Sequence, residues 1–271
     1  MTECVIIDRH AYILRLRLNR PDKKNALTRD MYTALADAIF NAENDPDIRV
    51  ILFEGSYGCV TGSVTGCFTA GNDLKDFQEQ PPRDKSAPVY RFITALAQTT
   101  VPMVAAVDGV AVGIGVTLLL HCDIILASER ARFQLPFVNL GLLPEAGSTY
   151  LLPKLVGQTR ASELLMTGRR FDVEEALDLG IVTRIVPTNS VNPDAPEGST
   201  LESEVLRVTQ ELAAKPPQAL RATKRLLKHD RDHVENRIQW EILEFSERLD
   251  SAECQEALLA FQEKRKPVFT A

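Results

Sequence analysis

The chain of 271 residues lacks most features that would assign it to a special class of protein. It has only five cysteines, an odd number without short paired spacings, which excludes a disulfide-stabilised scaffold and favours a reduced, cytoplasmic protein. The first residues lack the basic and apolar regions of a secretion signal. The most apolar stretch, residues 103–120, is interrupted by Asp108 and three glycines, so no membrane span is expected.

The sequence also has fewer positively charged residues than negatively charged ones. The sequence has 31 Lys and Arg residues against 37 Asp and Glu residues, which gives a formal net charge of −6. This balance argues against a protein that holds nucleic acid by bulk charge, and no nucleic-acid partner is expected. A hydrophobic content of 45% and a charged content of 25% are ordinary for a globular protein with a sizeable core.

Several familiar catalytic motifs are missing. The sequence has no Gly-x-x-x-x-Gly-Lys loop for phosphates and no Gly-x-Ser-x-Gly turn of serine hydrolases. Gly109, Gly113 and Gly115 lack the further glycine that a dinucleotide site requires. His229 and His233 are four residues apart without a third ligand, so a solvated helix face is the simpler interpretation. No metal site is therefore predicted.

Strand patterns alternate with helix patterns along the first 200 residues. Strands are predicted at residues 5–18, 50–54, 103–107, 123–127 and 181–186. Helices are predicted after Thr28 as N-cap and at residues 89–97, 113–120, 151–156, 160–166 and 172–180. Residues 55–66 are predicted to be a loop and residues 189–200 a linker. The pattern predicts an α/β core over residues 1–200 and a helical region over residues 201–271.

Two segments lead from a strand through glycine into a helix. In residues 68–74 (Phe-Thr-Ala-Gly-Asn-Asp-Leu), the main-chain amides of Gly71, Asn72 and Asp73 are predicted to be free donors of a first helical turn. Residues 108–115 (Asp-Gly-Val-Ala-Val-Gly-Ile-Gly) form the second segment. Either alone is more often an ordinary helix start, but two such turns facing one cavity would bind a developing oxyanion.

One acid stands out after these turns. Glu145 lies between a proline and an Ala-Gly pair, directly before an apolar helix. A lone acid at a helix start usually interacts with the helix dipole, so its position alone does not identify a catalyst. If the apolar residues Phe137, Val138 and Leu142 face the carboxyl group, they are expected to raise its pKa.

Four other residues have structural interpretations. Asp73 is expected to be an acid of a helix start, and Asn25 is expected to fix a turn. Thr117 is either a residue of a helix core or a hydroxyl in a pocket wall. Trp240 belongs to a helix that packs in the core or at a subunit interface.

Together these motifs resemble the crotonase, or enoyl-CoA hydratase/isomerase, superfamily. The resemblance rests on Asn-Arg-Pro at 19–21, Asn-Ala-Leu at 25–27, Ala-Gly-Asn-Asp-Leu at 70–74, Asp-Gly at 108–109, Gly-Ile-Gly at 113–115, Cys-Asp at 122–123, Leu-Gly at 140–141 and Pro-Glu at 144–145. It extends through Leu-Leu-Met-Thr-Gly at 164–168 to Phe-Gln-Glu-Lys-Arg-Lys-Pro-Val-Phe at 261–269, and so covers nearly the whole chain.

The resemblance implies a ββα-superhelix spiral core, with a helical C-terminal trimerisation region that forms a homotrimer or a dimer of trimers. It implies an acyl-CoA thioester substrate and no cofactor besides the coenzyme A of that substrate. By motif position, the amides of Asn72 and Ile114 would stabilise an oxyanion and Glu145 would be the catalytic acid. Coenzyme A and the thioester would be bound by Lys24, Ala26, Ala70, Gly71, Asn72, Asp73 and Leu74, with help from Lys264 and Arg265.

Members of this superfamily differ in their acids. The positions at which enoyl-CoA hydratases carry two glutamates hold Thr117 and Phe137, neither of which can activate water as a carboxylate would. Glu145 matches the acid of Δ3,Δ2-enoyl-CoA isomerases of the peroxisomal type, so the resemblance implies that a 3-enoyl double bond moves to the trans-2 position. The alternatives are isomerisation of a dienoyl or ring-derived acyl-CoA, weak hydration, thioester hydrolysis, and a non-catalytic acyl-CoA-binding protein.

Overall fold

The computed structural model describes residues 3–60, 63–187 and 200–269. Its larger sheet has six strands in the order β1-β2-β3-β6-β8-β11. The first two strands form an antiparallel hairpin, and every later pair in this order is parallel. The bounds are β1 (Val5–His10), β2 (Ile13–Leu18), β3 (Val50–Gly55), β6 (Met103–Val107), β8 (Ile124–Ser128) and β11 (Arg184–Val186).

A second sheet has five strands in the order β10-β9-β7-β5-β4. Its strands are β4 (Tyr57–Val60), β5 (Ser63–Thr69), β7 (Val110–Val112), β9 (Arg132–Gln134) and β10 (Arg170–Asp172). The prediction of a loop over residues 55–66 is wrong, because β4 and β5 form an antiparallel hairpin there. Glycine, serine and threonine weaken a strand pattern locally, but parallel pairing of β5 with β7 holds this segment in the sheet.

The chain repeats one unit three times. A strand of the larger sheet is followed by a strand of the second sheet and then by helical structure: β3 with β5, β6 with β7, and β8 with β9. The helices of this part are α2 (Leu74–Glu79), α3 (Pro88–Gln98), α4 (Ile114–Thr117), η2 (Leu118–His121), η3 (Val138–Leu140), α5 (Ser148–Val156), α6 (Gln158–Thr167) and α7 (Val173–Asp178). This repeat is the expected ββα spiral, and it places the strand-to-helix transition of each of the three units next to the second sheet.

Side chains of the larger sheet alternate between two apolar layers, as the strand pattern predicts. Leu14 and Phe53 belong to the main core under α1 (Arg29–Asn44) and α3, whereas Ile13 and Leu52 pack on α8 (Leu201–Ala213). Thr28 begins α1 as predicted, since its hydroxyl accepts a hydrogen bond from the amide of the residue three positions later.

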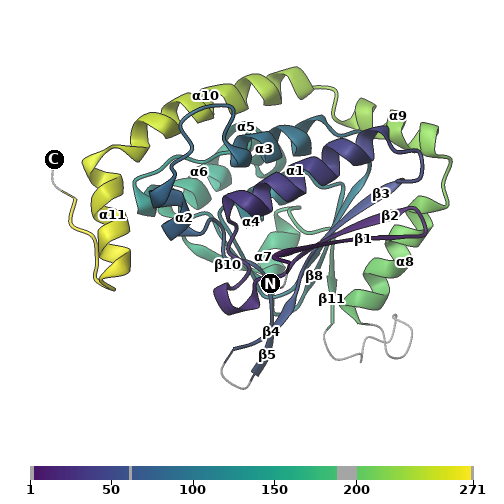
Figure 1. Cartoon of the computed structure of the whole chain (residues 1–271), viewed down its shortest axis with the longest axis horizontal. Helices are drawn as coiled ribbons and strands as arrows, with labels where there is room; N and C mark the ends of the chain where they lie inside the picture. The colour runs from purple at the N-terminus through teal and green to yellow at the C-terminus, as the bar shows by residue number, and fades with distance from the viewer. Residues whose placement is uncertain (1–2, 61–62, 188–199, 270–271) are drawn as a thin grey trace.

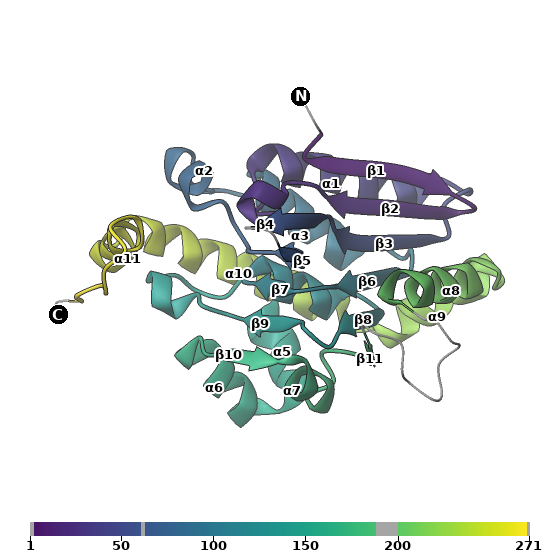
Figure 2. The ribbon, with the colours of Figure 1, turned by 90° about the horizontal axis from the view of Figure 1, so that it is seen from below.

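All regular elements described after residue 200 are helices: α8, α9 (Pro217–Leu227), α10 (Arg231–Leu249) and α11 (Ala252–Gln262). Helix α10 crosses over α5 and α3 and carries α11 beyond α2 (Figures 1 and 2). On α10, Ile238, Ile242 and Phe245 are buried, whereas Trp240 and Leu243 are exposed. This helix therefore has one face in the core and large apolar side chains on another side that stay mostly exposed in the described chain. The predicted linker at 189–200 lies almost entirely outside the described residues.

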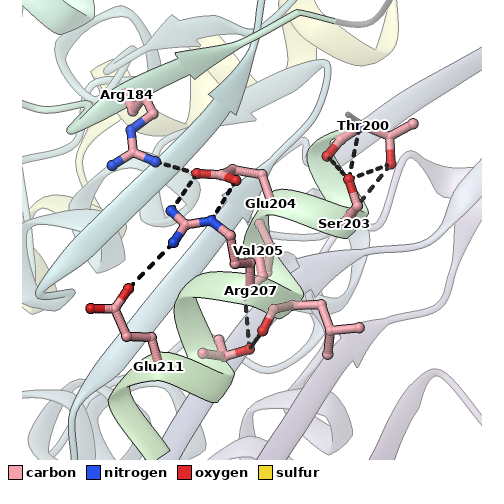
Figure 3. A network of polar contacts seen from close by, with 9 residues as sticks. Arg184, Thr200, Ser203, Glu204, Val205, Arg207 and Glu211 are labelled. Atoms are coloured by element: carbon pink, nitrogen blue, oxygen red, sulfur yellow. Dashed lines mark hydrogen bonds and ion pairs between the residues drawn. The ribbon is translucent and has the colours of Figure 1, made fainter. Parts of the chain in front are cut away.

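Helix α8 is attached to the larger sheet through its first turns. Thr200 and Ser203 form a reciprocal capping box, with N–H to hydroxyl distances of 3.2 and 2.8 Å (Figure 3). Glu204 then accepts hydrogen bonds from Arg184 of β11 and from Arg207 one turn along α8. The apolar layer and this ion-pair network together keep α8 on the face of the sheet opposite α1.

Candidate active site

Two of the segments predicted to bind coenzyme A lie side by side. The Lys24 carbonyl oxygen accepts a hydrogen bond from the Ala70 amide at 2.9 Å, and the Leu27 amide donates to the Gly71 carbonyl oxygen at 2.8 Å. Ala26 lies between these two contacts. The fold therefore joins residues more than 40 positions apart into one main-chain surface at the start of α2.

Asn25 fixes the turn that begins at Arg20, as predicted, and also connects this turn to the strand before α2. Its side-chain oxygen accepts a hydrogen bond from the Arg20 amide at 2.8 Å, and its side-chain nitrogen donates to the Cys67 carbonyl oxygen at 2.7 Å. Its own carbonyl oxygen accepts from the Thr69 hydroxyl at 2.7 Å. The residue is fully buried and adopts a left-handed conformation with φ +53°, which asparagine tolerates better than most residues.

Of the three amides predicted to be free in the first turn, one remains available. The Gly71 amide donates to the Thr69 hydroxyl at 3.1 Å, and the Asp73 amide donates to the Leu27 carbonyl oxygen at 2.9 Å, so the prediction is wrong for these two. Asn72 pairs with Leu27 as a parallel bridge, in which its own amide points away from that neighbour. Within the described chain, the Asn72 amide has no hydrogen-bond acceptor.

The second turn lies against the first. A side chain at Gly71 would place its first carbon 2.9 Å from the Val112 carbonyl oxygen, so the two main chains are in contact. Gly113 has φ +56° and ψ −118°, a conformation open to glycine, and Ile114 then begins α4. Because Ile114 is the first residue of this helix, its amide has no acceptor within the helix. The two adjacent turns thus present main-chain donors to the same region, the Asn72 amide from one and the Ile114 amide from the other.

Glu145 is buried close to α4, with 4% of its surface exposed. Its Oε1 accepts a hydrogen bond from the Thr117 hydroxyl at 2.6 Å, whereas its buried Oε2 has no partner in the described chain. Burial raises the pKa of Glu145 to about 8, an effect that the Thr117 hydrogen bond opposes. Phe137 and Leu142 are buried in this region, but Val138 is 46% exposed and does not belong to the apolar surroundings expected for this carboxyl group.

Tyr32 links the first turn to Glu145. Its hydroxyl donates a hydrogen bond to the side-chain oxygen of Asn72, and burial together with the nearby Glu145 carboxylate raises the pKa of Tyr32. Both Tyr32 and Asn72 line a cavity of about 310 Å³ between α1, α2 and the segment before α3. The other lining residues are Leu27, Arg29, Asp73, Asp76, Phe77, Gln80, Pro81, Pro82, Arg83, Asp84, Ser86, Ala87, Pro88 and Val89. Glu145 is not among the residues that line this cavity, but it is close enough to Tyr32 to raise its pKa.

Asp73 has the structural role predicted for it. Its carboxylate accepts hydrogen bonds from the amides of Lys75 and Asp76 at 3.1 and 3.2 Å, which caps α2. It also forms an ion pair with Arg20 at 2.8 Å. These contacts hold the start of α2, where Leu74 is the first helical residue, next to the donor turn.

The C-terminal basic residues lie at the far end of α2. Gln262 of α11 donates a hydrogen bond to Gln78 of α2 at 2.7 Å, which places Lys264 and Arg265 near that helix. Arg265 is held by Glu256 through two hydrogen bonds of 2.5 and 2.8 Å. Within one chain these residues are therefore separate from the Asn72 turn, and a role in phosphate binding stays a prediction.

Sequence reasoning missed two buried polar residues of this region. Tyr32 lies on the apolar face of α1, where its hydroxyl was indistinguishable from core packing. Glu241 of α10 is 6% exposed and accepts hydrogen bonds from Gly147 and Thr149, directly after Glu145. In each case the partner is distant in sequence, and no local motif connects the two.

The described residues form neither a metal site nor a membrane-crossing helix. No group of three His, Cys, Asp or Glu residues in the described ranges is placed to hold a metal ion. His233 stacks on Tyr150 with a ring separation of 6.3 Å and lies on an exposed face. None of the helices in the described part of the chain combines the length and the apolar character that a bilayer-crossing segment requires.

Comparison with known proteins identifies the family of this chain. Residues 8–271 match the family model described as enoyl-CoA hydratase/isomerase. The chain is 34% identical over 270 residues to enoyl-CoA delta isomerase 2 of Rattus norvegicus, covering 97% of this chain and 64% of that protein. It is 31% identical to 1,2-epoxyphenylacetyl-CoA isomerase of Escherichia coli, covering 100% and 99% of the two chains.

A solved structure shows the same fold. The crystal structure of an enoyl-CoA hydratase/isomerase from Pseudoalteromonas atlantica matches with a TM-score of 0.86 and 38% identity, covering 99% of this chain and 100% of that one. The chain therefore belongs to the enoyl-CoA hydratase/isomerase family and has the crotonase fold. It spans slightly less than two thirds of the length of the rat isomerase.

Proposed function

We propose that this protein is an acyl-CoA isomerase that converts a 3-enoyl-CoA to the conjugated trans-2-enoyl-CoA. The observation that carries the proposal is one buried carboxyl group, Glu145, next to two turns that each offer a main-chain amide. The two positions of hydratase glutamates hold Thr117 and Phe137, so neither carries the carboxyl groups that hydration of an enoyl-CoA would use.

The reaction needs one base that serves twice. The Glu145 carboxylate removes a proton from C2, and the electron pair of that C–H bond moves into the thioester, which becomes a dienolate. The amides of Asn72 and Ile114 bind the negative oxygen; a single donor of this kind is worth about 10²–10³ in rate. The protonated Glu145 then returns its proton to C4, and the double bond forms between C2 and C3. The balance requires no cofactor.

The burial of Glu145 suits this role. A carboxyl group with a pKa of about 8 exists in both protonation states near neutral pH, so it can accept a proton and release it again. The Thr117 hydroxyl stabilises the charged form that begins the reaction. We assign the proton transfer to Oε2, because it has no hydrogen-bond partner in the described chain.

A direct assay tests the proposal. Purified protein is mixed with trans-3-hexenoyl-CoA, and the ultraviolet absorption of the conjugated enoyl thioester is followed. Hydration of crotonyl-CoA is measured in parallel. We expect isomerisation with little hydration, and Glu145→Gln should lose turnover while it still binds the acyl-CoA. Fast hydration, or undiminished turnover of Glu145→Gln, would show that the single-base mechanism is wrong.

A second candidate is isomerisation of a ring-derived acyl-CoA. The E. coli relative that this chain matches over its whole length is named 1,2-epoxyphenylacetyl-CoA isomerase. The same oxyanion donors would serve such a thioester. Turnover of a ring-derived substrate, with no turnover of trans-3-hexenoyl-CoA, would favour this candidate.

We also propose that the protein forms a homotrimer or a dimer of trimers. Large apolar side chains are exposed on three C-terminal helices, including Leu226 of α9 at 76%, Trp240 of α10 at 65% and Phe261 of α11 at 63%. Large apolar side chains left exposed in a single chain are often covered by a partner. Sedimentation analysis tests this assembly, and a monomer at micromolar concentration would contradict it.

A further inference from the structure

A second buried glutamate lies behind the catalytic loop and has no part in the proposed reaction. Glu241 is on α10, the helix that crosses over α5 (Figure 1), and only 6% of its surface is exposed. Burying a carboxyl group is unfavourable unless it is hydrogen-bonded, so the groups that bind it indicate what it does.

All its hydrogen bonds come from the residues that follow Glu145. One carboxylate oxygen of Glu241 accepts from the Gly147 amide at 2.6 Å. The other accepts from the Thr149 amide at 3.0 Å and from the Thr149 hydroxyl at 2.6 Å. Glu241 therefore caps the start of α5 from another helix, where negative charge is favourable.

The loop that this cap holds has an unfavourable main-chain conformation. Ala146 has φ +61° and Gly147 has φ +70°. A left-handed conformation is unfavourable for alanine, so it persists only where surrounding contacts hold it. The Ala146 carbonyl oxygen accepts a hydrogen bond of 2.7 Å from Nε2 of His121, and the next amide is the one bound by Glu241. Side chains from two distant elements thus fix the main chain that carries Glu145.

We propose that Glu241 is a positioning residue: by holding the Gly147 and Thr149 amides, it keeps Glu145 directed at Thr117 and at the substrate. This inference rests on the proposed role of Glu145 as the proton carrier. Glu241 does not touch the reacting atoms; it acts through the loop and through its charge.

The charge of Glu241 has a measurable consequence. Its carboxylate raises the pKa of Glu145, in addition to the larger effect of burial. Burial also raises the pKa of Glu241 itself to about 7, against its hydrogen bonds to Thr149 and Gly147 and the attraction of Arg237 on α10. The other titratable groups that face Glu145 are Tyr32 of α1 and Tyr90 of α3.

The test compares three variants of the full-length protein. Glu241→Gln keeps the size and one acceptor oxygen but removes the charge. Thr149→Val removes one of the three hydrogen bonds and leaves the charge. Glu244→Gln is the matched control, since it makes the same change on the exposed side of the same helix. For each variant, kcat and KM for trans-3-hexenoyl-CoA are measured from about pH 5 to about pH 10.

For Glu241→Gln we expect kcat to fall by about 10-fold or more, while KM changes less than about threefold, because the loop loses its fixed position. The pH midpoint at which kcat/KM rises should decrease by about 0.5–1 pH unit, because the variant lacks the negative charge that raises the pKa of Glu145. Thr149→Val should show a smaller decrease in kcat and no decrease in the pH midpoint. Glu244→Gln should have the kcat and the pH profile of the wild type. Unchanged kcat and an unchanged pH profile in Glu241→Gln would overturn the proposal, even if the variant melts earlier.

A readout without turnover separates this proposal from the proposed function. Infrared difference spectra report the stretch of a protonated buried carboxyl group, which Glu145→Gln assigns to Glu145. If the wild type fails to isomerise any 3-enoyl-CoA but Glu241→Gln still lowers the titration midpoint of Glu145, the function is wrong and the positioning role holds. If the wild type is active but the Glu145 titration and kcat are the same in Glu241→Gln, the positioning role is wrong.

Discussion

The Thr117 hydroxyl controls at what pH Glu145 can act as a base, and this can be tested by one isosteric change. Thr117→Val keeps the shape of a fully buried residue and removes the 2.6 Å hydrogen bond to the carboxyl oxygen. Because Oε2 already lacks a partner, the ionised carboxylate of the variant would have no described hydrogen bond. Its pKa must therefore rise further above the usual range.

The size of the effect follows from the energy of that bond. A hydrogen bond to a charged group contributes about 1.5–3 kcal/mol, and about 1.4 kcal/mol corresponds to one pKa unit. The pKa of Glu145, about 8 in the wild type, should thus rise by about 1–2 units in Thr117→Val. At pH 7 only about a tenth of Glu145 is ionised in the wild type, so the variant should lose about 10- to 100-fold in kcat/KM there.

The assay is the pH dependence of kcat/KM for trans-3-hexenoyl-CoA, which reports the free enzyme. The loss in Thr117→Val should shrink steadily as the pH rises above the wild-type midpoint, since both proteins then approach full ionisation. Thr117→Ser retains a hydroxyl and should keep the wild-type profile. A loss in Thr117→Val that is equal at every pH would refute the reasoning, because it would show that Thr117 acts without changing the ionisation of Glu145.

Three further predictions address the donors, the stability and the turn. Ile114→Pro removes the amide at a first helical position that accommodates proline, so kcat should fall about 10²- to 10³-fold, whereas Ile114→Val should stay near wild type. In denaturant titrations, the wild type should lose about 3 kcal/mol of unfolding free energy more than Glu145→Gln between about pH 5.5 and pH 8, because the folded protein retains a proton on Glu145 that the unfolded chain has released. Asn25→Ala should lower the unfolding free energy by about 3–5 kcal/mol in the same titrations, since it leaves buried main-chain groups unpaired in a left-handed turn. Equal pH dependence in Glu145→Gln, or activity in Ile114→Pro, would contradict these assignments.

The parts of the fold that depend on local pattern were predictable. The strand at residues 103–107 agrees with β6, because a continuous run of apolar residues ends at each side in a turn signal. The N-cap at Thr28 was also predictable, because its hydrogen bond joins residues only three positions apart. The hairpin of β4 and β5 was not, since its ladder is completed by β7, which comes about 40 residues later. A local sequence window contains no information about such a partner.

In the candidate site, too, local motifs were predictable and contacts between distant segments were not. The two turns and Glu145 carry local motifs, whereas the groups that set their chemistry come from elsewhere. The acceptor of the Gly71 amide is a side chain two residues away, yet the acceptor of the Asp73 amide, Leu27, is 46 positions away. The pairing of two distant segments therefore decides which of the three neighbouring amides stays free for an oxyanion. The motif alone could not show this.

The ionisation of Glu145 illustrates why the remainder needs the structure. Three effects set its pKa, and each has a different origin: burial by the fold, the hydroxyl of Thr117 on α4, and the charge of Glu241 on α10. The first and third raise the pKa, and the second lowers it. Because these effects oppose one another, their balance depends on distances of a few ångströms between segments up to about 100 residues apart. The sequence identifies the carboxyl group but does not determine whether it is protonated or ionised at neutral pH. The variants Thr117→Val and Glu241→Gln measure this balance directly, because their pH profiles should move in opposite directions.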